Sequence, residues 1–100
     1  MTAVKPTIRT TWTFLSNHAH VLVAIAREPE ARVRDLAMLV GITERAVLQI
    51  LADLEASGTI VRHRVGRRTS YQIDRSIALR HPLEHHRTVG DIIRLVEPGE

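Results

Sequence analysis

The sequence predicts a mainly α-helical domain with one small β-hairpin, an α+β fold of 100 residues. Three patterns support this class. Apolar residues recur at helical spacing in several segments, a glycine separates two of these segments, and apolar residues alternate with polar ones near residues 60–73. A chain of this length builds one modest core. We therefore expect a single domain at residues 12–96, with a flexible arm at 1–11 and a short tail at 97–100.

The first predicted helix lies in the segment SNHAHVLVAIAREP. Ser16 or Asn17 is expected to cap it, and it should end before Pro29, because the residue before a proline avoids helical geometry. Its centre, residues 21–26, is apolar on all sides and must be buried on more than one face. Three large side chains just before this helix are expected to anchor the chain to the core: Trp12, Phe14 and Leu15.

Two further helices are predicted around Gly41, which is placed as a left-handed C-cap. The first, VRDLAMLV, should turn Leu36, Ala37, Leu39 and Val40 inward. Thr43 is expected to cap the second, ERAVLQILADLEAS, which carries one apolar stripe at positions i, i+3, i+4 and i+7. The residues of that stripe are Val47, Ile50, Leu51 and Leu54, and Gly58 should stop the helix.

A hairpin and a last helix complete the prediction. Strands near Ile60–Arg64 and Ser70–Ile73 should turn around Gly66, with Tyr71 as the inner aromatic residue. The last helix should run to Val96 behind a capping box formed by Thr88 and Asp91. Its apolar stripe is Val89, Ile92, Ile93 and Val96.

The predicted order is helix, helix, glycine turn, helix, hairpin, helix. Two helices joined by a short glycine turn form a helix-turn-helix, and a hairpin directly after the second helix adds a wing. The stretch from residue 33 to 73 resembles the winged helix-turn-helix transcriptional regulators of the ArsR/MarR-like superfamily. The residues that carry this resemblance are Leu36-Ala37, Gly41-Ile42-Thr43, Leu54-Glu55, Gly58, Ile60, Arg62, Gly66-Arg67 and Tyr71. The resemblance implies sequence-specific binding to double-stranded DNA and regulation of transcription.

The positive charge of the chain is concentrated in the hairpin. The whole chain carries a formal net charge of +3. Residues 59–75 hold five arginines and one acid, so all other residues together sum to −1. Such a patch is typical of a surface that binds nucleic acid. The predicted helix at 43–57 is net −2 and cannot supply the attraction itself.

In the resembling architecture, the helix at 43–57 enters the major groove and the wing at 60–73 contacts the backbone or minor groove. The predicted groove-facing residues are Thr43, Glu44, Arg45, Leu48 and Gln49. Arg45 is suited to guanine, Gln49 to adenine and Glu44 to cytosine, although Glu44 also suits a helix N-terminus for electrostatic reasons alone. The predicted wing contacts are Arg62, Arg64, Arg67 and Arg68.

One helix and one wing read only a few base pairs, so we expect a two-fold homodimer on a pseudo-palindromic site. The first and last helices offer the apolar surface for it, through Val21, Val23, Ala24, Val89, Ile92, Ile93 and Val96. The alternative is that the last helix only covers its own domain. Any small-molecule effector is expected at the dimer interface, near Trp12 and the first helix.

Other classes of function have weaker support. The absence of cysteine excludes disulfides and thiolate metal sites. The histidines near residues 18–20 and 81–86 match no ligand signature, so we expect neither a metal nor a cofactor. No catalytic pair or phosphate-binding glycine loop is present, and we expect no enzymatic activity. With no signal peptide and no apolar run long enough for a bilayer, we expect a cytoplasmic protein with no membrane partner. A winged protein-interaction module and an RNA-binding protein remain the alternative functions.

Overall fold

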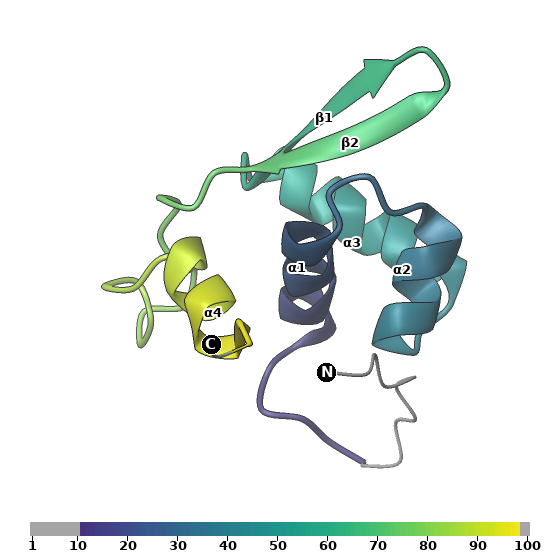
Figure 1. Ribbon diagram of the computed structural model, residues 1–100. Helices are drawn as coiled ribbons and strands as arrows, with labels where there is room; N and C mark the ends of the chain where they lie inside the picture. Colours follow the sequence, from purple (N-terminus) through teal and green to yellow (C-terminus); the bar gives the residue numbers. More distant parts are fainter. Residues whose placement is uncertain (1–10, 99–100) are drawn as a thin grey trace.

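The computed structural model describes residues 11–98 and has the expected order of elements (Figure 1). Four helices and one two-stranded antiparallel hairpin form the domain. The hairpin projects from one end of the helical body (Figure 1). The elements are α1 (Asn17–Arg27), α2 (Val33–Val40), α3 (Glu44–Ala56), β1 (Ile60–Val65), β2 (Arg68–Ile73) and α4 (Val89–Val96).

The predicted helix ends are confirmed, because local side-chain hydrogen bonds set them. The Ser16 hydroxyl accepts from the first turn of α1, and the Thr43 hydroxyl accepts from the Ala46 N–H at 3.0 Å at the start of α3. Thr88 and Asp91 form the expected capping box of α4. Gly41 ends α2 with φ 83°, a left-handed conformation that glycine adopts without steric cost.

The hairpin is longer and its turn tighter than predicted. Its register pairs Ile60 with Ile73 at the base and Val65 with Arg68 at the tip, which leaves a two-residue turn of Gly66 and Arg67. Gly66 has φ 62° at the first turn position, where a type II′ turn requires glycine. Arg68 was expected at the tip but belongs to β2.

Helix α1 lies at the centre of the domain and packs against α2, α3 and α4 (Figure 1). The sequence indicated that α1 must be buried on more than one face, and we assigned the second face to a dimer partner. In the structure, α4 of the same chain covers it. The buried side chains form one continuous core, whose most enclosed members are Val21, Ile25, Leu36, Val47, Ile60 and Ile93.

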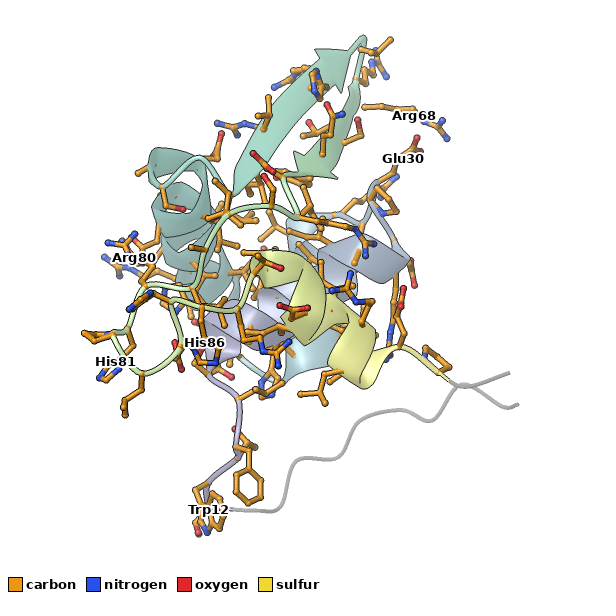
Figure 2. The ribbon with its side chains drawn as sticks, turned by 90° about the vertical axis from the view of Figure 1, so that its left-hand side faces the viewer. Trp12, Glu30, Arg68, Arg80, His81 and His86 are labelled. Carbon is orange, nitrogen blue, oxygen red and sulfur yellow. The ribbon has the colours of Figure 1, made fainter. Side chains whose placement is uncertain are left out.

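Two expectations about apolar side chains are wrong. Trp12 and Phe14 do not anchor the chain to the core, since they are 64% and 92% exposed. Their rings pack edge to face on each other, with centroids 4.9 Å apart, below the helical body (Figure 2). Leu39 was expected to face inward but is 40% exposed, because the core side of α2 is already filled by its neighbours Leu36, Ala37 and Val40.

The segment between β2 and α4 folds into an ordered loop. A bridge between Ala78 and Thr88 closes it, and the Leu79 N–H donates to the Arg87 carbonyl at 2.9 Å. The side chains of residues 80–87 are exposed. Across residues 11–98, no helix has both the length and the apolar character needed to cross a membrane.

Candidate nucleic-acid interface

Helix α3 has one buried face and one exposed face. The predicted stripe is buried in the core: Val47, Ile50, Leu51 and Leu54. At 100° per residue, Arg45 and Gln49 lie nearly opposite this stripe, and both are exposed. Leu48 lies on the flank nearer the hairpin and is 56% exposed. The outer face of α3 therefore combines a cation, an amide and an apolar side chain.

Thr43 and Glu44 occupy the start of this helix. The Thr43 hydroxyl already accepts a hydrogen bond as the N-cap, so its first role is to begin the helix. Glu44 is exposed in the first turn, where the helix dipole favours an acid. Both positions are accessible, but each has a structural role that does not require a ligand.

Gln49 belongs to a chain of side-chain contacts that sequence analysis missed. Its Nε2 donates to Asp53 Oδ1 at 3.3 Å, and the other oxygen of Asp53 lies 2.8 Å from His18 Nε2 on α1. Asp53 and His18 are about half exposed. The hydrogen bond with His18 is the main cause that lowers the pKa of Asp53, with smaller contributions from Gln49 and from the charge of Arg80. The helical spacing of Gln49 and Asp53 is visible in the sequence, whereas the contact with His18 is not.

The wing arginines fall into two groups. Arg62 lies 3.4 Å from Glu55 of α3, and Arg68 lies 3.4 Å from Glu30 in the loop between α1 and α2. Figure 2 shows Arg68 and Glu30 directed toward one another. Arg64 and Arg67 are exposed and form no ion pair within residues 11–98. These two cations are immediately available to a ligand, whereas the other two must exchange a carboxylate for it.

A groove of about 810 Å³ separates the wing from α3 and the start of α2. Four acids and four arginines line it, so its charges balance. We name it the wing groove. Its charged residues are Glu28, Glu30, Asp35, Glu55, Arg32, Arg62, Arg67 and Arg68. The net positive charge predicted for the wing is therefore expressed at its tip rather than along this inner side.

A second cavity, of about 880 Å³, lies between α1, α3 and the loop before α4. Its floor is apolar, with Leu22, Leu54 and Val89, and its rim carries His18 and Asp53. We predicted that an effector would bind near Trp12 and the first helix. Helix α1 does line this cavity, but Trp12 is not among its lining residues.

The residues predicted for a dimer interface divide by burial. Four of them are buried within this chain and are not available to a partner in this conformation: Val21, Ala24, Val89 and Ile93. The other three are partly exposed: Val23, Ile92 and Val96. Leu95, which the apolar stripe did not include, is 72% exposed on α4. Within residues 11–98, no group of three or more His, Asp or Glu side chains is arranged to hold a metal ion.

Three helices, a glycine turn between the second and third, a projecting hairpin and a closing helix define a winged-helix domain. Among solved structures, the chain is similar to MepR, a transcription regulator of the Staphylococcus aureus multidrug efflux pump MepA. The TM-score is 0.52 and the identity 19%, over 80% of this chain and 50% of MepR, so this chain spans about half of that structure's length. No protein-family model and no curated protein matches the sequence.

Proposed function

We propose that the protein binds double-stranded DNA and regulates transcription as a winged-helix homodimer. The observation that carries this proposal is the pairing of an exposed polar face on a capped helix with two unpaired arginines on a projecting hairpin. Arg45 and Gln49 form the helix face, and Arg64 and Arg67 form the arginine pair. The winged-helix fold shared with MepR, which is named as a transcription regulator, supports the same class of function.

Base reading is assigned to the outer face of α3. Arg45 is suited to a bidentate contact with guanine and Gln49 to a bidentate contact with adenine in the major groove. Leu48 is suited to the methyl group of thymine. Because α3 is capped and buried along its inner stripe, these side chains are held on a rigid element.

The wing provides affinity that does not depend on sequence. Arg64 and Arg67 are assigned to phosphates or to the minor groove. The acids of the wing groove, defined above, oppose the approach of a polyanion along the inner side of the hairpin. We therefore assign the first backbone contact to the wing tip, with Arg62 and Arg68 joining when their carboxylate partners are displaced.

Dimerisation is assigned to the exposed part of α4 and its neighbours. Leu95 is exposed, and Ile92 and Val96 are partly exposed on the same helix. We expect sedimentation equilibrium to show a dimer, and Leu95→Asp to shift it toward the monomer. A wild-type protein that remains monomeric at micromolar concentration would contradict this part of the proposal.

The test begins with selection of bound sites from a pool of random duplexes. Fluorescence anisotropy then compares the selected duplex with a scrambled one over a salt series. The variant Arg64→Ala/Arg67→Ala should weaken both duplexes similarly and reduce the salt slope by about one to two contacts. The matched control, Arg80→Ala/Arg87→Ala, removes the same charge from the loop before α4 and should leave the slope nearly unchanged.

The outcomes separate the candidate functions. Preferential binding of the selected duplex supports the regulator. Failure to bind any duplex at low salt overturns it and favours a wing that recognises an acidic protein. Tighter binding to single-stranded RNA than to duplex DNA would favour the RNA-binding alternative.

A further inference from the structure

We infer that Asp53 is a positioning residue that fixes the amide of Gln49 in the orientation that reads adenine. This inference rests on the proposed DNA-binding function and deepens it. Asp53 is assigned no contact with a base. It acts on the side chain one helical turn before it, and it is itself held by His18 from another helix.

The orientation of the Gln49 amide follows from the chemistry of its partner. An ionised carboxylate only accepts hydrogen bonds. The group that faces Asp53 Oδ1 at 3.3 Å must therefore be the amide nitrogen of Gln49, not its oxygen. This contact removes the two-fold ambiguity of the amide and fixes which edge of Gln49 faces outward.

The outward edge matches adenine. The Nε2 amide carries two hydrogens, one on the same side as Oε1 and one on the opposite side. When Asp53 takes the opposite hydrogen, Gln49 presents one acceptor and one donor side by side. Adenine offers the complementary pair in the major groove, the N6 donor and the N7 acceptor. A Gln49 held in this way is preorganised for that base before DNA arrives.

His18 connects this arrangement to the body of the domain. Its Nε2 donates to Asp53 Oδ2 at 2.8 Å, so each carboxylate oxygen has its own partner. The backbone position of His18 is fixed by α1, the central helix of the fold. The hydrogen bond with His18 lowers the pKa of Asp53, which keeps the carboxylate ionised near neutral pH.

Two simpler roles for Asp53 make different predictions. As an i,i+4 pair, Gln49 and Asp53 stabilise the helix whether or not DNA binds. As an acid near a polyanion, Asp53 weakens binding to every duplex equally. Only a positioning role changes the preference for adenine over other bases at one position, and it does so only through Gln49.

The experiment is a double-mutant cycle on base preference. Wild type, Asp53→Ala, Gln49→Ala and the double variant are titrated against the selected duplex. Each base pair of that duplex is replaced in turn, and the adenine that responds to Gln49→Ala is also replaced by 7-deazaadenine, which lacks N7. Glu55→Gln is the matched control, because it removes one negative charge from the same helix without touching Gln49. Circular dichroism melts check that each variant is folded.

We expect wild type to prefer adenine at that position by about tenfold or more, as one bidentate contact provides. Asp53→Ala should lose most of this preference while binding the scrambled duplex at least as tightly as wild type. In the Gln49→Ala background, Asp53→Ala should change the preference no further. Glu55→Gln should keep the full preference.

Two results would overturn the inference while leaving DNA binding intact. One is an adenine preference that survives Asp53→Ala unchanged. The other is a selected site in which no position responds to Gln49→Ala. Failure of wild type to bind any duplex would instead overturn the proposed function itself.

Discussion

The backbone N–H of Tyr71 in β2 donates a hydrogen bond to the carbonyl of Pro29, in the loop between α1 and α2, at 3.0 Å. This contact attaches the outer edge of β2 to the helical body. The Tyr71 ring is 9% exposed, and burial raises the pKa of its hydroxyl. The base of the wing is therefore fixed to the core, whereas its tip extends into solvent (Figure 1).

Tyr71→Ala should lower the free energy of unfolding by about 3 kcal/mol, because it removes a buried aromatic ring that joins the hairpin to the core. Urea denaturation of the two proteins measures this change. Tyr71→Phe is the control and should cost less than about 1.5 kcal/mol, since the packing volume is retained. A loss below about 1 kcal/mol for Tyr71→Ala would contradict the role given to the ring.

Glu30→Gln and Glu55→Gln should each increase affinity for duplex DNA. Each change frees a wing arginine, Arg68 or Arg62, from a carboxylate 3.4 Å away. Exposed ion pairs contribute less than about 1 kcal/mol, which corresponds to a gain of about two- to fivefold. Anisotropy titrations should show this gain on selected and scrambled duplexes alike. Glu84→Gln, in the loop before α4, provides the control, and an equal gain there would show that net charge alone is responsible.

Gly66→Ala should destabilise the hairpin by about 1–2 kcal/mol, because φ 62° is a left-handed conformation that a Cβ disfavours. No atom lies within 4 Å of the added Cβ, so the cost comes from the backbone and not from a clash. Hydrogen exchange of the β1 and β2 amides measures the local loss. Gly66→Asn should cost less, since asparagine tolerates this conformation. Equal protection in wild type and the alanine variant would refute this account of the turn.

Folding stability should decrease as the pH falls below about 4. The backbone N–H of Thr88 is the main cause that lowers the pKa of Asp91, and Arg94 and the Thr88 hydroxyl lower it further. A carboxyl whose pKa is lower in the folded state contributes stability above its unfolded pKa. That contribution is lost as the pH falls through the folded value.

Asp91→Asn should make the free energy of unfolding less dependent on pH in this acid range. Urea denaturation at neutral pH and near pH 3 tests this expectation. Some dependence should remain in the variant, because hydrogen bonds also lower the pKa values of Asp53 and Asp74. A variant with the full acid dependence of wild type would contradict the role of the capping box.

The sequence by itself determined the features that depend on neighbouring residues. Helix caps such as Thr43, the glycine at 41 and the stripe along α3 were predicted because each involves residues within about one or two helical turns. The order of these elements was enough to predict the winged fold. Leu39 was placed wrongly because a short helix offers two adjacent apolar faces, and only packing decides which one is buried.

Only the tertiary structure decided which distant residues meet. It placed α4 against α1 where we expected a dimer partner, brought Glu30 to Arg68, and set His18 beside Asp53, 35 residues away. The physical reason is that hydrophobic burial is non-directional: it requires each apolar face to be covered but does not specify by which segment. The exposed ion pairs then follow from that packing, since their weak energies do not direct it.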